Sequence, residues 1–302
     1  MSARFLTVVL ERAFNMRDGF GREIDYMRIS VIDSCNLNCY YCNPCDNNEH
    51  CHALNILSVK EVLCIVRAAT RLGIKHFRLT GGEPLLHPQL DEMVLQIKKI
   101  PGVSSVSLTT NAVLLVQHAK WLKEAGIDSI NVSLDTIDAS EYERITKKPL
   151  LEEVKHGINA AIECGIRVKI NVVLTPQTDV VALTRYVAKK GTDIRFIEMM
   201  PVGEGHTNGV EPYKKVIGTL SKLYGEPCRI NTEKTKEINS GNDKRKIPDN
   251  GPAEYYIFPE LGIRVGLIQA IHGKFCDTCN RIRVTADGRL MPCLGSSVTM
   301  DL

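Results

Sequence analysis

The sequence lacks an apolar run long enough to cross a membrane, and no small-residue cleavage site follows the short run Phe5–Leu10. It contains no internal repeat and no low-complexity tract. Its net charge is also small. The net charge of +3 is too small to argue for a nucleic-acid partner, although a modest excess of Lys and Arg suits a phosphorylated small molecule. We therefore expect a cytoplasmic protein that binds neither membrane nor nucleic acid.

The 302 residues are 44% hydrophobic, which is enough for a sizeable core. A chain of this length forms one large domain or two small ones, and barrels of strands and helices reach this size as one domain. Its 11 cysteines include two triplets, and clustered cysteines in such a chain bind metal more often than they form disulfides. Cys64 and Cys164 lie in apolar helical patterns and are expected to pack in the core.

Strand-like and helix-like segments alternate from Tyr26 onward. Strands are predicted at Met27–Ile32, His76–Thr80, Val103–Thr109, Ser129–Leu134, Arg167–Leu174 and Asp193–Glu198. Helices are predicted at Val59–Leu72, Gln89–Ile100, Leu115–Ala125, Leu151–Cys164 and Val180–Lys190, several of them ended by a glycine that can take positive φ. Both parities of the strands are interpreted as apolar, as in parallel strands covered by helices. Six βα units in succession predict a parallel barrel or part of one.

The pattern changes after Gly203. Residues 203–211 and 232–251 are polar and resemble loops, and short strands are predicted at Tyr255–Phe258, Ile263–Ile268 and Ile282–Thr285. We therefore divide the chain into a core barrel, 1–202, and a small C-terminal β-rich layer, 203–302.

Three cysteines, Cys35, Cys39 and Cys42, lie within eight residues directly after the first predicted strand; we call them the first triplet. One short loop with these spacings can fold its sulfurs around a single metal centre. Structural zinc requires four closed ligands, whereas three cysteines on a [4Fe–4S] cluster leave one iron open. A zinc knuckle, or a coincidence of cysteines, is the alternative.

This CxxxCxxC pattern resembles the signature of the radical S-adenosylmethionine (radical SAM) enzymes. In that family the open iron chelates the amino and carboxylate groups of SAM, and the reduced cluster cleaves the sulfonium bond to release a 5′-deoxyadenosyl radical. The second predicted strand ends in Gly81-Gly82-Glu83-Pro84, which resembles the element that holds the SAM amino group in these enzymes. A plain turn is the alternative for that motif taken alone.

Polar and cationic residues mark the other predicted strands. Thr109 and Ser133 are equally well interpreted as helix caps or as ligand contacts. A cation within a strand is costly unless it is paired or points at an anion. Convergence on one anionic ligand, rather than solvent-facing strand ends, best explains four such residues: Arg28, Arg78, Lys169 and Arg195.

A second triplet, Cys276, Cys279 and Cys293, lies in the C-terminal part, and a zinc site would need a fourth ligand such as His272. Arg281 and Arg283 follow at alternate positions, on one face of a predicted strand.

The stretch from about Gly19 to Leu294 resembles the GTP 3′,8-cyclase family of molybdenum cofactor biosynthesis. The resemblance rests on Gly21-Arg22, Arg28-Ile29-Ser30, Leu108-Thr109-Thr110-Asn111, Asn131-Val132-Ser133-Leu134-Asp135, Arg195-Phe196-Ile197-Glu198 and the second triplet with Arg281 and Arg283. It implies an incomplete (β/α)6 barrel of the TIM type, with two [4Fe–4S] clusters facing each other across its mouth. The first cluster would cleave SAM, and the open iron of the second would bind the guanine of GTP.

The resemblance also implies site residues. The SAM contacts would be Tyr41, Gly82, Ser133 and Met200. The GTP contacts, chiefly to phosphate, would be Arg28, Arg78, Thr109, Lys169, Arg195, Arg281 and Arg283. In the implied reaction the radical removes the ribose 3′ hydrogen and C3′ then adds to C8 of guanine. No residue beyond the clusters is expected to be catalytic, and an electron donor such as a flavodoxin or ferredoxin is implied. A homodimer is compatible with these features.

The sequence departs from the family at three places. His76 stands where the family usually has lysine, the loop 42–57 has an unusual composition, and the family continues further to a C-terminal Gly-Gly tail. Cys45 and Cys51 in that loop are interpreted as inert. The alternatives are a radical SAM paralogue acting on another nucleotide or a peptide, an inactive truncated copy, and a non-catalytic metal-binding protein.

Overall fold

The computed structural model describes residues 16–42, 55–201, 209–230, 251–296 and 298–302. These residues form one sheet in the order β12-β11-β10-β1-β2-β3-β4-β5-β6-β9-β8-β7. Its strands are β1 Tyr26–Ser30, β2 His76–Thr80, β3 Ser105–Thr110, β4 Ser129–Ser133, β5 Val168–Val173, β6 Asp193–Ile197, β7 Cys228–Ile230, β8 Glu254–Phe258, β9 Ile263–Ile268, β10 Arg281–Val284, β11 Arg289–Met291 and β12 Met300–Asp301.

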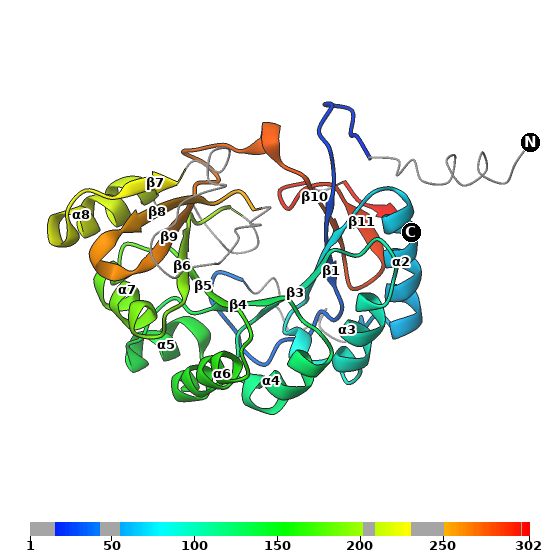
Figure 1. The fold of residues 1–302 in the computed structure, drawn as a ribbon, viewed down its shortest axis with the longest axis horizontal. Coiled ribbons are helices and arrows are strands. Elements are labelled where there is room, and N and C mark those ends of the chain that lie inside the picture. The colour runs from blue at the N-terminus through cyan, green and yellow to red at the C-terminus, as the bar shows by residue number, and fades with distance from the viewer. Residues whose placement is uncertain (1–15, 43–54, 202–208, 231–250, 297) are drawn as a thin grey trace, which may run out of the picture.

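Strands β1 to β6 are parallel neighbours, and the sheet curves into an open barrel with its helices on the outer side (Figure 1). The helices are α2 Val59–Arg71, α3 Leu90–Lys98, α4 Leu115–Glu124, α5 Ala139–Thr146, α6 Leu151–Glu163, α7 Val180–Lys189 and α8 Gly218–Tyr224. The partial TIM-type barrel predicted from the sequence is confirmed.

The C-terminal strands extend this sheet at both edges. Strand β10 adds parallel to β1 and continues through the antiparallel β11 and β12, while β9 adds parallel to β6 and continues through β8 and β7. The β-rich C-terminal part therefore shares the hydrogen-bonded sheet of the core, and it closes part of the gap that six strands alone would leave.

Contrary to the expectation, the strands are apolar on only one of their two faces. Alternate residues such as Phe77, Leu79 and Val132 are fully buried and pack with the helices. Because side chains of a strand alternate between faces, the other parity faces the concave side of the sheet. That parity carries polar and charged residues, among them Arg28, Arg78, Ser107, Asn131, Lys169, Asn171 and Arg195. The barrel interior is therefore a polar lumen suited to a charged ligand.

Local signals explain the helix boundaries. The Ser58 side chain accepts the amide of Glu61, whose side chain bonds back to the amide of Ser58, so that α2 begins with a capping box. The side chains of Asp138 and Asp179 likewise accept a backbone amide in the first turn of α5 and of α7. Positive φ follows four helices as predicted, at Gly73, Gly126, Gly165 and Gly191.

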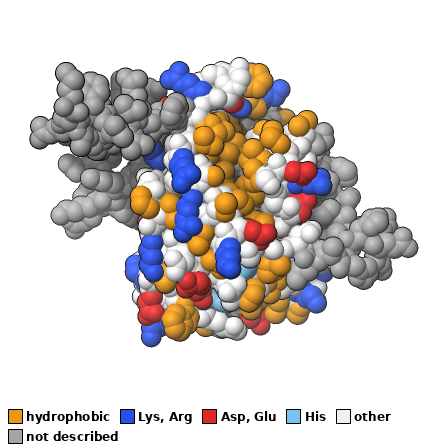
Figure 2. All heavy atoms as spheres, turned by 90° about the vertical axis from the view of Figure 1, so that its right-hand side faces the viewer, with side chains coloured by type: hydrophobic (Ala, Val, Ile, Leu, Met, Phe, Trp, Pro, Cys, Tyr) orange, Lys and Arg blue, Asp and Glu red, His pale blue; other side chains and the backbone are white. Residues whose placement is uncertain are grey.

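Within the described residues, no helix is both long and apolar enough to span a membrane. Figure 2 shows the side of the molecule that carries α2 and the C-terminal strands, where hydrophobic side chains lie between basic and acidic ones. Val298, Met300 and Leu302 are among the exposed apolar residues of the chain.

Candidate active site

The two cysteine triplets lie at opposite ends of the barrel strands. The first triplet follows β1, so it lies where parallel strands end. Cys276 and Cys279 precede β10, which runs parallel to β1 with Arg281 opposite Tyr26, so this pair lies where the strands begin. Cys293 follows β11, which returns antiparallel to β10 towards the same end.

This placement corrects the expectation of two clusters facing each other across the mouth. Strand β1 itself separates the triplets, and its five residues span roughly 15 Å. A substrate that reaches both ends must therefore lie along the lumen.

The loop of the first triplet packs directly against the turn after β2. Gly82 donates its amide to the carbonyl of Ile32 at 2.8 Å, and Glu83 donates to the carbonyl of Ser34 at 2.8 Å. A Cβ atom on Gly82 would lie 2.2 Å from the Ser34 oxygen and 2.4 Å from the Asp33 oxygen. Glycine is thus required for this close approach of two backbones. A side chain at Gly82 would displace the cysteine loop, so such a variant cannot isolate a contact with SAM.

Glu83 ties the ends of β2 and β3 together. Its side chain is 1% exposed and accepts three hydrogen bonds: from Thr110 Oγ1 at 2.7 Å, the Asn111 amide at 2.7 Å and the Leu85 amide at 3.0 Å. Burial raises the pKa of Glu83, while these bonds act to lower it. Asn111 in turn donates from its side chain to Asn36 Oδ1 at 2.7 Å, inside the first triplet. A buried carboxylate therefore positions the cysteine loop through one intermediate residue.

Alanine at Glu83 is expected to lower the free energy of unfolding of the iron-free chain by roughly 2–4 kcal/mol, because three donors lose their acceptor in a buried site. Glutamine keeps part of the hydrogen bonding and should cost less. Urea unfolding measures both, with the exposed Glu124→Ala on α4 as the matched control. Equal stability of Glu83→Ala and Glu124→Ala would contradict the role given to Glu83.

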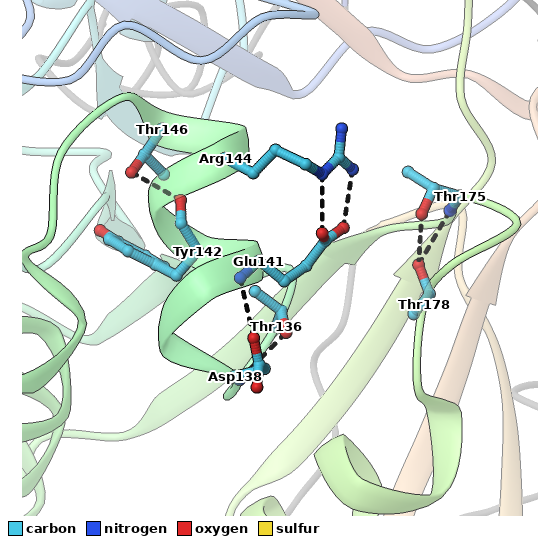
Figure 3. A network of polar contacts seen from close by, with 8 residues as sticks. All are labelled: Thr136, Asp138, Glu141, Tyr142, Arg144, Thr146, Thr175 and Thr178. Carbon is cyan, nitrogen blue, oxygen red and sulfur yellow. Dashed lines mark hydrogen bonds and ion pairs between the residues drawn. The ribbon is translucent and has the colours of Figure 1, made fainter.

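Helix α5, which was not predicted from the sequence, supports the cysteine loop from another side. Asn38 donates its amide to the carbonyl of Thr146 at 3.0 Å, and Tyr40 donates to that of Ile145 at 3.1 Å. The helix is held by its Asp138 cap and by Arg144, which donates two bonds of 2.7 Å to Glu141 (Figure 3). The last turn of α5 thus fixes the middle of the first triplet.

The surroundings of the first triplet disfavour the negatively charged form of its thiols. Partial burial raises the pKa of all three thiols, to about 12 for Cys39, and the charge of Asp135 adds to the effect at Cys39 and Cys42. Asp135 itself accepts the Tyr41 hydroxyl at 2.5 Å and the Val173 amide at 2.7 Å. Burial raises the pKa of Asp135 to about 6, despite these two bonds.

The proposed SAM residues lie at this same end. Gly82 follows β2, Ser133 is the last residue of β4 and is exposed, and Met200 follows β6. The Tyr41 hydroxyl is directed at Asp135.

Three arginines lie side by side between the two triplets. Arg283 on β10, Arg28 on β1 and Arg78 on β2 share one register level of three adjacent parallel strands. Burial and the charges of Arg283 and Arg78 hold the pKa of Arg28 well below its ordinary value. Burial and the charge of Arg281 lower the pKa of Arg283 to about 10. Arg28 Nε is buried without a hydrogen-bond partner, and within the described residues no carboxylate pairs with Arg28 or Arg283.

Like charges in a row, one with an orphaned donor, are costly unless an anion joins them. A cavity of about 440 Å³ is lined by Arg28, Arg283, Ser30 and Thr80, among other residues. We call Arg28, Arg78 and Arg283 the arginine row.

His76 lies one step nearer the strand beginnings, opposite Tyr26 and Ser105. Burial lowers its pKa, so the imidazole is uncharged at neutral pH and cannot replace the lysine common in the family. Its Nδ1 lies 2.8 Å from Ser105 Oγ.

The opposite wall of the lumen holds two further cations. Lys169 and Arg195 are 5% and 3% exposed, and Thr109 occupies the same register level as Asn131 and Lys169. Arg195 donates to Asn171 Oδ1 at 3.0 Å and to Asn131 Oδ1. The expectation that these cations face a shared interior is consistent with this placement, whereas solvent-facing strand ends are excluded for Lys169 and Arg195 by their burial.

Another buried carboxylate fixes the segment that follows β9, at the end where β6 finishes. Glu198 is 3% exposed and accepts the amides of Ile271 at 2.7 Å and His272 at 3.1 Å, as well as bonding to His272 Nδ1. His272 is thereby held by Glu198. It lies where β6 finishes, whereas Cys276 and Cys279 lie where the strands begin, so His272 is not placed as a fourth zinc ligand. Among the described residues, no three His, Cys, Asp or Glu side chains are grouped so that they could hold a single metal ion.

Several residues that the structure places at the site received no role from the sequence, namely Arg22, Glu83, Asn111, Asp135 and Glu198. All five lie in the motifs that carried the family resemblance, which was the available signal. Cys45 and Cys51 lie outside the described residues. The Cys64 and Cys228 side chains are exposed, so Cys64 does not pack in the core as expected.

Two family models together cover most of the chain. Residues 29–183 match the radical SAM superfamily, and residues 192–302 match the family described as Molybdenum Cofactor Synthesis C. Two curated relatives are similar over nearly the whole chain. GTP 3′,8-cyclase of Clostridium perfringens (strain SM101 / Type A) is 37% identical, covering 92% of this chain and 83% of that protein. GTP 3′,8-cyclase of Pelotomaculum thermopropionicum is 38% identical, covering 95% and 86%.

A solved structure shows the same fold. Streptococcus suis SuiB bound to S-adenosylmethionine matches with a TM-score of 0.65 at 15% identity, over 92% of this chain and 63% of that chain. This chain spans less than two thirds of SuiB, and at this identity the likeness concerns the fold alone. The family models and the curated relatives go further: the chain belongs to the radical SAM superfamily and, within it, to the family of the GTP 3′,8-cyclases.

Proposed function

We propose that this protein converts GTP to 3′,8-cyclo-7,8-dihydro-GTP in molybdenum cofactor biosynthesis, with two [4Fe–4S] clusters and SAM as cofactors. The observation that carries the proposal is the arginine row, which lies in a polar lumen between two cysteine triplets. Guanidinium groups bind phosphate oxygens with a fixed fork of donors, and the orphaned Arg28 Nε requires such an acceptor.

The residues present fit the clusters. Each triplet supplies three free thiols and no fourth cysteine of the described residues follows in its loop, so each leaves one position for a ligand. The first triplet would hold the cluster that, with SAM, supplies the carbon radical for hydrogen abstraction. The second would hold the cluster that binds guanine.

The protein's own residues orient and enclose the substrates. Gly82, Tyr41, Ser133 and Met200 would contact SAM at the end where the strands finish. The arginine row with Arg281, Thr109, Lys169 and Arg195 would hold the triphosphate and ribose along the lumen. Fixing both substrates in one lumen aligns the reacting atoms and limits the access of water to reactive species.

The electron source belongs to the same proposal. A flavodoxin or ferredoxin in the cytoplasm would reduce the clusters, since exposed iron–thiolate centres require a reducing compartment. A homodimer is compatible with the fold.

Anaerobic incubation with SAM, a reductant and GTP carrying deuterium at C3′ tests the function. We expect a cyclised guanine nucleotide and deuterium in the 5′-deoxyadenosine, with no product from ATP or CTP as matched controls. SAM cleavage without a GTP product would favour a paralogue with another substrate. An iron-loaded protein that cleaves no SAM would favour an inactive copy, and bound zinc without iron would favour a non-catalytic protein.

A further inference from the structure

Before β1 the chain forms a short hairpin, residues 17–23, in which Arg17 pairs antiparallel with Glu23. This hairpin reaches the second triplet through one side chain. Arg22 donates from Nη1 to the carbonyl oxygen of Cys276 at 2.6 Å, across 254 positions of sequence. The same guanidinium is braced on its other side by Asp18, with Nε to Oδ2 at 2.6 Å and Nη2 to Oδ2 at 2.5 Å. Asp18 also accepts the amides of Phe20 and Arg22, both at 2.9 Å, so the brace is built into the turn itself.

Further bonds fix the hairpin against the same loop. Asn280, which follows Cys279, donates to Asp25 Oδ1 at 2.6 Å, and its carbonyl accepts the Tyr26 amide at 3.2 Å. Arg22 is therefore held at a set position beside the second triplet, with its side chain 25% exposed.

The two triplets have different charged neighbours. Asp135 and Glu83 face the thiols of the first triplet. At the second triplet, Arg22 donates to the carbonyl oxygen of Cys276, and Arg281 follows Cys279 by two residues. The acidic groups near the second triplet are Asp18, which pairs with Arg22, Asp25, which accepts a hydrogen bond from Asn280, and the exposed Asp277.

We propose that Arg22 is a positioning residue of the second cluster, which holds the Cys276–Cys279 turn and raises the reduction potential of the iron bound there. Adding an electron makes a cluster more negative, so a fixed guanidinium nearby favours the reduced form. Loss of Arg22 removes a positive charge and also leaves the Asp18 carboxylate without its partner. Both effects lower the reduction potential of the second cluster. The inference rests on the proposed location of a cluster at the second triplet.

The test is a potentiometric titration of the reconstituted full chain followed by electron paramagnetic resonance. The signal that shifts on addition of SAM reports the first cluster, and the signal that does not shift reports the second. Arg22→Gln is expected to make reduction of the second cluster about tenfold less favourable, a fall of about 59 mV in its potential for a one-electron couple. The first cluster should keep its potential.

Two variants separate the effects. Arg22→Lys keeps the charge but not the fork of donors, so its potential should lie between the parent and Arg22→Gln. Arg17→Gln removes an exposed charge from the same hairpin and should match the parent. A loss of about half the iron in Arg22→Gln alone would support the positioning role.

Full iron content and parent potentials in both Arg22 variants would overturn the inference while leaving the proposed function intact. Absence of iron from the second triplet in the parent protein would instead remove the cluster location on which both depend.

Discussion

Alanine at all three cysteines of the first triplet is expected to halve the iron content and abolish SAM cleavage. The parent should hold about eight irons per chain after anaerobic reconstitution, because two sites each take a four-iron cluster. Alanine at the second triplet should also leave about four irons, but SAM cleavage should persist, since the two sites lie at opposite ends of β1. Iron analysis and the release of 5′-deoxyadenosine measure the two effects.

The matched control removes three cysteines elsewhere, Cys64, Cys164 and Cys228, and should keep eight irons and full SAM cleavage. Stoichiometric zinc in the parent, with no iron–thiolate absorption, would contradict both cluster assignments. Loss of SAM cleavage on removal of the second triplet would show that the sites depend on each other.

Methionine at Arg283 or at Arg28 is expected to weaken GTP binding by about 1.5–3 kcal/mol, roughly ten- to a hundredfold. Each change removes a charged donor from the arginine row and keeps an apolar stem of similar length. SAM affinity should stay near the parent value, because the proposed SAM site lies beyond the far end of β1. Anaerobic isothermal titration with each ligand measures both affinities.

The same variants carry a second expectation. Burial and the adjacent arginines lower the pKa of Arg28, so removing one charge relieves repulsion, and the ligand-free chain should be no less stable than the parent. Arg289→Met on β11 is the matched control, since this exposed arginine pairs with Asp287 and Asp301 outside the row. Unchanged GTP affinity in Arg283→Met would mean that the arginine row does not bind the triphosphate.

Local sequence signals were enough to predict the βα core. The boundaries of β2 and β9 match the prediction. The ends of the other predicted strands and helices differ from the prediction by no more than two residues. Local chemistry explains this success, because capping residues, glycines and apolar periodicity act within a few residues of each element. The cysteine spacings and the Gly-Gly-Glu-Pro turn also pointed to the family, since they depend on short segments.

Short elements escaped the sequence analysis. Helix α5 has eight residues, and β7, β11 and β12 have two or three, too few to show a period. The polar face of the strands was not predicted, because the Val, Ile and Leu residues between the polar ones were interpreted as continuous apolar runs. Which face of each strand is apolar depends on which face the helices cover, and this is a property of the tertiary structure.

Tertiary structure alone decided where the two triplets lie. Nothing local to Cys276 or Cys279 specifies that β10 pairs parallel with β1, and this pairing puts the second triplet at the end opposite the first. The arginine row likewise exists only through the register of three strands far apart in sequence. Long-range hydrogen bonds such as Arg22 to Cys276 and Asn111 to Asn36 complete the site. Sequence spacing determined which residues carry the chemistry, whereas strand pairing decided their distances, because register is set by contacts between segments that no local pattern encodes.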